Sequence, residues 1–214
     1  MTEDIKFAEF RKIARLNRNC VITEKIDGTN AQVYIADDGV TMHIGSRSRW
    51  LDAKNDNHGF YAWADAHRED LLKLGPGRHY GEWWGQGIQR KYGQTTKHFS
   101  LFNPNKWNSV TLPANINVVP VLYDGPFTTD AVTKVVEVLR EHGSFAAPGF
   151  MDPEGVVVYH THANQYFKVT LENDELPKSQ VPKVEPMGDP TPKPDPDPSC
   201  GSVSPVEYYN RNRA

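Results

Sequence analysis

Lys25 is the residue whose surroundings best suit covalent chemistry. Residues 23–30 read Thr-Glu-Lys-Ile-Asp-Gly-Thr-Asn, so this lysine follows an apolar run and stands three residues before a glycine. An amine attacks phosphorus or carbonyl carbon only when it is unprotonated, so a nucleophilic lysine needs a cation, a metal or burial that lowers its pKa from roughly 10.4. The pattern fits such a nucleophile, and it also fits an exposed lysine in a tight turn.

Four further segments carry charged residues on or beside stretches typical of strands. They are residues 45–49 (Gly-Ser-Arg-Ser-Arg), 80–87 (Tyr-Gly-Glu-Trp-Trp-Gly-Gln-Gly), 153–158 (Pro-Glu-Gly-Val-Val-Val) and 166–170 (Tyr-Phe-Lys-Val-Thr). Because each places a charge at a strand, we expect the five segments to line a cleft between sheets.

The order and spacing of these segments resemble those of the covalent nucleotidyltransferases, the superfamily of polynucleotide ligases and mRNA capping enzymes. More narrowly, Lys-Ile-Asp-Gly-Thr-Asn followed by Gly-Glu-Trp-Trp-Gly-Gln-Gly-Ile-Gln is similar to the ATP-dependent RNA ligase family, its second phage type in particular. DNA ligases usually carry arginine two residues after the glycine of the lysine motif, where this chain has Asn30. The resemblance extends from about residue 21 to residue 170.

The resemblance implies an ATP-dependent RNA ligase that joins an RNA 3′-OH to a 5′-phosphate. Lys25 would attack the α-phosphate of ATP and become adenylylated, with Mg²⁺ or Mn²⁺ as the metal. Glu154 would be the catalytic carboxylate that holds this metal, and Lys168 would neutralise the α-phosphate. The family usually has a second lysine two positions after the first, where this chain has Thr170.

The resemblance also implies a set of nucleotide-binding residues. Glu24 would accept a hydrogen bond from the adenine amino group, and Phe99 would stack on adenine, although a core position is the alternative for this aromatic ring. Glu82 would bind a ribose hydroxyl or a metal-bound water, because an unpaired carboxylate is costly to bury. The remaining members of the set are Ile26, Arg47 and Lys168.

Three residues are expected to bind RNA. Thr29 and Asn30 match the positions that touch the RNA 3′ end, or else they satisfy the backbone of the turn. Arg47 and Arg49 are two residues apart and would project to the same side of an extended chain, where a guanidinium grips a phosphate bidentately. Arg47 fits the family position better, Arg49 is assigned to RNA, and a solvated basic face is the alternative.

Composition limits where a polynucleotide could bind. The chain has 214 residues, a net charge of −3 and 38% hydrophobic residues, so any basic surface must be local. Candidates besides the two arginines are residues 89–92 and Lys97. Cys20 and Cys200 match neither a zinc spacing nor a disulfide framework, and the first residues resemble no signal peptide, so we expect a cytoplasmic enzyme.

Hydrophobic periodicity predicts an α+β fold of mainly antiparallel sheets with flanking helices, the nucleotidyltransferase architecture. Helices are expected at residues 4–18, 60–74 and 128–140, and strands at 21–24, 31–36, 40–44, 79–84, 98–102, 117–123, 155–160 and 165–171. His160 and His162 are expected to be exposed rather than metal ligands.

The pattern of prolines divides the chain into two parts. Nine prolines occur between residues 177 and 205, a composition that favours extended polyproline structure over a packed core. We therefore predict a nucleotidyltransferase domain at 1–176 and a tail at 177–214 that could contact a partner protein. Relatives often carry a further C-terminal domain at this point.

Two other functions also fit the sequence. One is a DNA ligase on the same scaffold, and the other is a nucleotide-binding or RNA-binding module that has lost catalysis. Capping with GTP is a weaker third alternative.

Overall fold

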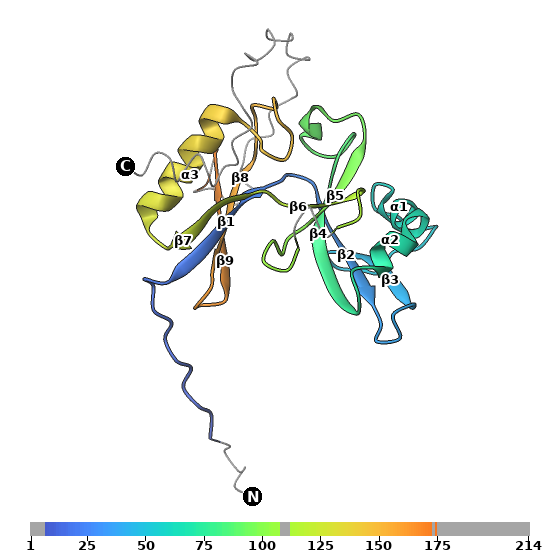
Figure 1. The fold of residues 1–214 in the computed structure, drawn as a ribbon, viewed down its shortest axis with the longest axis horizontal. Helices are drawn as coiled ribbons and strands as arrows, with labels where there is room; N and C mark the ends of the chain where they lie inside the picture. The colour runs from blue at the N-terminus through green and yellow to red at the C-terminus, as the bar shows by residue number, and fades with distance from the viewer. Residues whose placement is uncertain (1–6, 108–111, 173, 175–214) are drawn as a thin grey trace, which may run out of the picture.

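The computed structural model describes residues 7–107, 112–172 and 174, which form two β-sheets and three α-helices (Figure 1). The strands are β1 (Asn19–Lys25), β2 (Thr29–Ile35), β3 (Met42–Ser46), β4 (Gly77–Gly85), β5 (Lys97–Leu101), β6 (Ile116–Val118), β7 (Val121–Pro126), β8 (Gly155–His160) and β9 (Gln165–Thr170). The helices are α1 (Phe60–Ala66), α2 (Arg68–Leu72) and α3 (Thr129–His142), with a short 3₁₀ turn, η1, at Lys91–Gly93.

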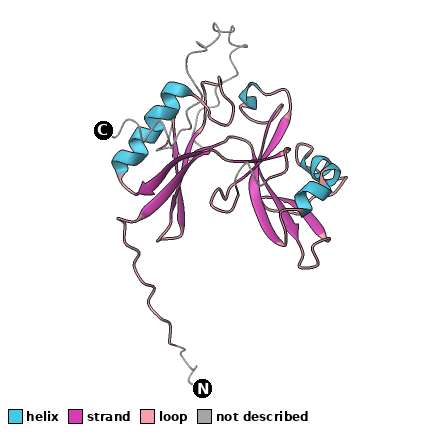
Figure 2. Ribbon diagram, viewed as in Figure 1, coloured by secondary structure: helices cyan, strands magenta, loops and turns pink. Residues whose placement is uncertain are grey.

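Sheet A has the strand order β7-β1-β8-β9, and all of its neighbouring strands are antiparallel. Helix α3 covers one of its faces and buries apolar residues against β1, β7 and β8. The helix begins where the Thr128 hydroxyl accepts a hydrogen bond from the Ala131 N–H, and it ends at Gly143 with a φ of 74°. The opposite face of sheet A carries no helix of the described chain (Figure 2).

Sheet B has the strand order β3-β2-β4-β5-β6, in which only β5 and β6 are parallel. Helices α1 and α2 cover one face, where alternate residues of β2 (Ala31, Val33 and Ile35) are buried. The period of two places the other residues of each strand on the helix-free face. The α3 side of sheet A and the α1–α2 side of sheet B lie outermost in Figure 2, so the helix-free faces turn toward the middle of the molecule.

Two short connections join the sheets. Residues 26–28 lead from β1 into β2, and residues 119–120 lead from β6 into β7. A small apolar cluster fills this junction; its buried members are Ile26, Trp84, Tyr92, Val119 and Ala147. The expected α+β class with mainly antiparallel sheets is confirmed, and the junction fixes how the end of β1 meets sheet B.

Three expected elements differ from the structure. Residues 7–16 form no helix and expose their apolar side chains, Phe7 by 93% and Phe10 by 84%, so this prediction was wrong. Helical spacing alone does not stabilise a helix without a surface on which its apolar face can pack. The strand expected at 117–123 is two strands in different sheets, separated at Pro120, which has no N–H to donate. The helix expected at 60–74 is interrupted at His67.

The expected tail at 177–214 lies outside the described residues, as does Cys200, so the domain boundary stays a prediction. Within the described ranges, no helix is both long enough and apolar enough to span a membrane.

Candidate active site

Lys25 is the last residue of β1, on the helix-free face of sheet A. It pairs in register with Gly155 of β8, which in turn pairs with Thr170 of β9. The Lys25 side chain is 20% exposed and forms an ion pair with the carboxylate of Glu154. The expected nucleophile and the expected metal ligand are therefore direct neighbours, although 129 positions separate them in the sequence.

Gly155 allows Glu154 to reach this position. Its φ is 152°, and a Cβ at residue 155 would clash with the carbonyl oxygen of Val169 on the neighbouring strand. The Glu154 carbonyl accepts a hydrogen bond from the Leu171 N–H at 3.0 Å, which ties the start of β8 to the end of β9. The Glu154 side chain is only 8% exposed, so its charge faces Lys25 rather than solvent.

Glu82 approaches the same site from β4 of sheet B. Its two carboxylate oxygens accept hydrogen bonds from the Gly28 N–H and the Asn30 side-chain amide, each at 3.1 Å. Burial raises the pKa of Glu82 to about 7, and the nearby negative charge of Glu154 also raises it. The positive charge of Lys25 and the two hydrogen bonds lower the pKa and offset part of this rise. Glu82 thus stabilises the turn after Lys25 through hydrogen bonds and interacts electrostatically with Lys25 and Glu154.

The loop between β4 and β5 holds the segments that carry Lys25 and Glu154. The Tyr92 hydroxyl accepts a hydrogen bond from the Asp27 N–H at 2.8 Å. The Arg90 guanidinium pairs with Asp27 at 3.3 Å and with Asp152, two residues before Glu154, at 2.6 Å. The sequence suggested Arg90 as part of a basic surface for phosphates, whereas its described partners are two carboxylates.

Glu24 points to the opposite side of β1 from Lys25. Its carboxylate accepts hydrogen bonds from the Ser144 hydroxyl at 2.6 Å and from the Phe145 and Ala146 N–H groups at 2.8 Å. Burial raises the Glu24 pKa, while these three donors act against the rise. Glu24 is 1% exposed, so its contacts are with the loop after α3, and an adenine contact stays a prediction.

Lys168 lies on the helix-free face of sheet A, but at a distance from Lys25. Lys168 pairs with Val157 of β8, and Val157 pairs with Thr23, which is two residues before Lys25 on β1. The Lys168 side chain is exposed. Thr170 occupies the row of Lys25, and its hydroxyl donates to the Glu172 carbonyl at 2.9 Å. The position that carries the family's second lysine therefore holds a hydroxyl group.

The two arginines of the second segment do not lie on an extended chain. Residues 47–49 form a turn closed by a hydrogen bond from the Ser46 N–H to the Arg49 carbonyl at 2.9 Å. The inference that Arg47 and Arg49 project to one side of a strand was therefore wrong, although both side chains are exposed. Arg49 donates to the Asp56 carbonyl at 3.4 Å.

The turn residues expected to bind RNA have partners within the protein. The Thr29 hydroxyl accepts a hydrogen bond from the Asn57 amide at 3.0 Å, and Asn30 donates to Glu82. The sequence did not indicate Asn57 as a site residue, because it lies in none of the five motif segments. Thr29 and Asn30 lie at the start of β2, directly after the turn that Lys25 begins.

Two apolar residues expected to bind nucleotide belong to hydrophobic clusters. Phe99 pairs with Trp83 on the helix-covered face of sheet B, is fully buried and lies 5.2 Å from the Phe60 ring. Stacking on adenine was therefore wrong, because strand alternation turns this ring into the core. Ile26 is 5% exposed in the junction cluster beside Trp84.

His160 was expected to be exposed, but it is buried, and its Nε2 lies 2.7 Å from the Leu16 carbonyl oxygen.

The donor set fits a metal that is shared with a phosphate substrate. Among the described residues, no group of three or more histidine, cysteine, aspartate or glutamate side chains could hold a metal ion. Glu154 and Glu82 are the carboxylates beside Lys25. Mg²⁺ usually binds through one or two carboxylates and completes its shell with water and substrate phosphate oxygens, and two carboxylates can supply the protein share.

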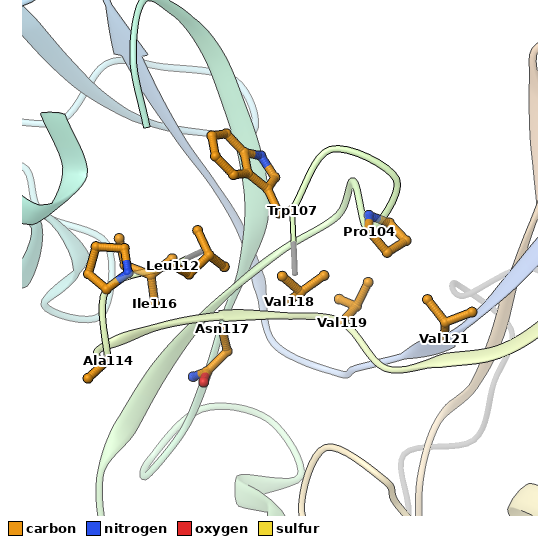
Figure 3. Close-up of a pocket in the computed structure, with 10 residues that line it drawn as sticks. Pro104, Trp107, Leu112, Ala114, Ile116, Asn117, Val118, Val119 and Val121 are labelled. Atoms are coloured by element: carbon orange, nitrogen blue, oxygen red, sulfur yellow. The ribbon is translucent and has the colours of Figure 1, made fainter. Parts of the chain in front are cut away.

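A cavity of about 540 Å³ lies away from this site, along the segment that leads through β6 (Figure 3). Its lining is almost wholly apolar and includes Trp107, Leu112, Ile116 and Val119. None of the charged groups around Lys25 lines it. This cavity therefore offers no chemistry to the site.

The fold of this chain has counterparts among solved protein structures. A comparison with curated protein sequences finds no significant match. Among solved structures, a ligand-free mutant of the Naegleria gruberi RNA ligase matches at a TM-score of 0.55 and 19% identity, covering 72% of this chain and 50% of that one. A mutant of the same ligase with ATP and Mn matches at 0.56 and 18%, covering 73% and 51%.

A third structure, a mutant of that ligase with AMP and Mn, matches at a TM-score of 0.52 and 18% identity, covering 72% of this chain and 50% of the other. The chain thus spans about half the length of the solved ligases that it matches, and the likeness establishes the fold. The sequence profile of the RNA ligase family matches residues 18–170, which include every segment of the candidate site. The chain belongs to the RNA ligase family.

Proposed function

We propose that this protein is an ATP-dependent RNA ligase that works through a lysyl-AMP intermediate. The observation that carries the proposal is the position of Lys25, at the end of β1, in contact with Glu154 and within electrostatic reach of Glu82. Family membership supports the reaction class. The similar structures that contain ATP or AMP with Mn support the choice of nucleotide and metal.

In the first step, the Lys25 amine loses a proton and its Nζ forms a bond to the α-phosphorus of ATP. The bond from that phosphorus to the bridging oxygen breaks, and pyrophosphate leaves. The bond with Glu82 holds Gly28 against β4, which fixes the turn that follows the nucleophile. Because Lys25 is paired in register with Gly155 of the antiparallel strand β8, its backbone position is fixed before the substrate arrives.

A divalent cation would supply charge neutralisation on the phosphates. Glu154 and Glu82 would hold it. Lys168 faces the same side of sheet A as Lys25 and would place a second positive charge near the phosphates. Arg47, on an exposed turn beside β3, would contribute to binding the nucleotide and the 5′-phosphate.

Two further transfers complete the reaction. An oxygen of the RNA 5′-phosphate attacks the phosphorus of the lysyl-AMP, which frees Lys25 and leaves an adenylylated RNA end. The RNA 3′-OH then loses its proton and attacks the 5′-phosphorus, and AMP leaves. Thr29 and Asn30, at the start of β2, are proposed to position the 3′ end, with Arg49 as a further RNA contact.

Two further proposals concern the surroundings of the enzyme. The proline-rich composition of residues 177–205 supports contact with a partner that binds extended proline segments. A reducing, cytoplasmic compartment fits the cysteines, since Cys20 is a free thiol in a buried position.

The test is a sealing assay with matched ends. The protein is incubated with ATP, Mn²⁺ and strands that carry a 5′-phosphate and either a ribose or a deoxyribose 3′-terminal nucleotide. We expect sealing at the ribose terminus, and no sealing by Lys25→Ala. Preferential sealing of the deoxyribose terminus would indicate a DNA ligase, and transfer from GTP instead of ATP would indicate a capping enzyme.

A further inference from the structure

The helix-free face of sheet B changes in character along its length. At the junction end, Trp84 is buried by the apolar cluster that contains Ile26. The next positions carry Asn30, Glu82 and Ser100, which pair with one another in register and include the carboxylate beside the Lys25 site. Beyond them the face is open to solvent, so a strand of substrate leaving the site in this direction would meet it first.

Aromatic side chains dominate this open end. We call it the aromatic platform; its residues are Tyr34, His43, Trp50, Arg78, Tyr80 and Phe102. The side chains of Tyr80, Trp50 and Phe102 are exposed by 51%, 47% and 37%. The register places Tyr80 opposite Gln32, and Arg78 opposite Tyr34, on the same side as Glu82. Successive same-face positions on a strand are roughly 7 Å apart, so Arg78 lies about 14 Å from Glu82 along β4.

The rings of the platform are held in place by contacts with one another. The Tyr34 and His43 rings stack with centroids 6.0 Å apart, and the His43 and Trp50 centroids are 5.5 Å apart. The Arg78 guanidinium lies over both outer rings, 4.9 Å from the Tyr34 centroid and 5.5 Å from that of Trp50. The Trp50 ring also lies against Gly45, where a side chain would displace it.

The charge of the platform is positive. Arg78 is exposed, and on this face it donates a hydrogen bond to the neutral side-chain amide oxygen of Gln32 at 3.1 Å. Apart from Glu82, the residues of β2, β3, β4 and β5 that share this side of the sheet include no aspartate or glutamate. A net charge of −3 for the whole chain makes such a surface unusual in this protein. Exposed rings together with a guanidinium suit unpaired bases and phosphates, because bases stack on aromatic side chains and on arginine.

We propose that the aromatic platform binds unpaired RNA nucleotides next to the reacting end and leads the strand over sheet B toward Lys25. The inference rests on the proposed ligase function. Two observations select this occupant: the platform is continuous with the face that carries Glu82, and its positive charge complements a phosphate backbone. Tyr80 lies one same-face position from Glu82 and is the first ring that a strand leaving the site would meet.

The experiment separates nucleotide chemistry from RNA binding. Self-adenylylation with labelled ATP and Mn²⁺ is measured for the wild type and for Tyr80→Ala, Trp50→Ala and Arg78→Ala. Binding of a fluorescent, 5′-phosphorylated single-stranded RNA is measured without ATP. We expect the variants to adenylylate within about twofold of the wild type, because the platform does not touch Lys25. We expect their dissociation constants for RNA to rise at least about fivefold, the smallest effect of losing one stacked base.

Three controls test stacking itself. Tyr80→Phe keeps the ring and should bind like the wild type. Phe167→Ala removes a ring with 56% exposure from the other face of sheet A and should also bind normally. With an abasic strand as the probe, Tyr80→Ala should bind with nearly the wild-type affinity, because no base is present to stack. Arg78→Ala should still bind this strand more weakly than the wild type does, and its binding should depend less on salt.

Several results would overturn the inference. Wild-type affinity in all three platform variants, or no measurable binding of RNA by the wild type, would exclude the platform as an RNA surface. A change from dimer to monomer in the variants, measured by sedimentation, would assign the platform to a contact between copies of the chain. Absence of adenylylation in the wild type would instead overturn the proposed function, so the two failures are distinct.

Discussion

The two sheets contribute to the site in different ways. Sheet A carries Lys25 and Lys168, with Glu154 directly before its strand β8, and its other face is covered by α3. Sheet B carries one carboxylate, Glu82, which is largely buried and bonded to the turn after Lys25. We infer that sheet A supplies the groups that react with phosphates, whereas sheet B fixes the turn and offers a surface to the substrate.

Two adjacent residues of β1 show how one strand separates structural from chemical groups. Glu24 is 1% exposed and its carboxylate is bonded to the loop after α3, whereas the Lys25 side chain is 20% exposed and faces Glu154. Strand alternation alone produces this difference. A charged residue next to a nucleophile is therefore not necessarily part of the reaction.

The largest expected effect comes from closing the space where the two sheets meet. In Gly28→Ala, the new Cβ would lie 2.5 Å from the Trp83 carbonyl oxygen and 2.8 Å from the Trp84 Cβ. Because backbone atoms of β4 cannot move aside, the turn must shift and lose its bond to Glu82. We expect a loss of about 3 kcal/mol in the free energy of unfolding, with adenylylation close to background. Urea denaturation and labelling with ATP measure the two effects.

Gly39→Ala is the matched control for this change. Gly39 has a positive φ of 71° in the β2–β3 turn, but no atom lies within 4 Å of the position of its Cβ. Gly39→Ala should lower the free energy of unfolding by about 1 kcal/mol through backbone strain alone and should leave adenylylation unchanged. An equal loss of adenylylation in both variants would show that the contact between turn and β4 is not what positions Lys25.

A smaller effect, dependent on pH, is expected from Glu82. Its pKa is about 7 in the folded protein, against an ordinary value of 4.5, so the folded state binds its proton more tightly. The stability that this group contributes is therefore complete below pH 4.5 and is lost as the pH rises through about 7. Glu82→Gln has no carboxyl group at this position, so its stability does not undergo this loss. The free energy of unfolding of the variant minus that of the wild type should therefore rise between pH 5 and pH 8, by about 3 kcal/mol at most.

Urea denaturation at several pH values measures this difference, because the Glu24 carboxyl is common to both proteins and its contribution cancels. A constant difference between Glu82→Gln and the wild type across this range would contradict an elevated pKa. A difference that falls with pH would mean that the folded protein favours the charged carboxylate.

The smallest effect is expected from Arg90, which links the two sheets through Asp27 and Asp152. The pairs are partly exposed, with a 27% exposed Arg90 side chain, so Arg90→Ala should cost about 1 kcal/mol of stability. Adenylylation should slow by about tenfold, because the segments that carry Lys25 and Glu154 lose their common partner. Stability and labelling rate are measured on the same preparations.

Lys91→Ala is the control for Arg90→Ala, since it removes an exposed cation from the same loop without breaking either ion pair of Arg90. Equal slowing in both variants would assign the effect to the charge of the loop rather than to the two ion pairs.

Much of this fold could be predicted from local signals. Alternating apolar residues marked β2, a continuous run of valines marked β8, and Thr128 and Gly143 marked the ends of α3, because these features act within a few residues. Lys25, Glu82 and Glu154 could be selected as candidates from their motifs. Their meeting at one site depends on strand register, which local signals do not define.

Contacts between distant segments explain what the sequence did not reveal. The donors to Glu24 lie about 120 positions later in the chain, and no local pattern announces them. Phe99 was assigned to adenine from the family resemblance, and the sequence could not decide against it because neither the register of β5 nor the side covered by α1 is visible there. The apolar residues at 7–16 have helical spacing but lack a surface to cover.

The most direct test of the central claim is the identity of the residue that receives AMP. The protein of residues 1–214 is incubated with ATP and Mn²⁺, digested, and analysed by mass spectrometry for peptides that carry one adenylate. We predict a single modified peptide, with the adenylate on Lys25 and none in Lys25→Ala. An adenylate on any other residue, or an unmodified chain under conditions in which the wild type remains folded, would contradict the account.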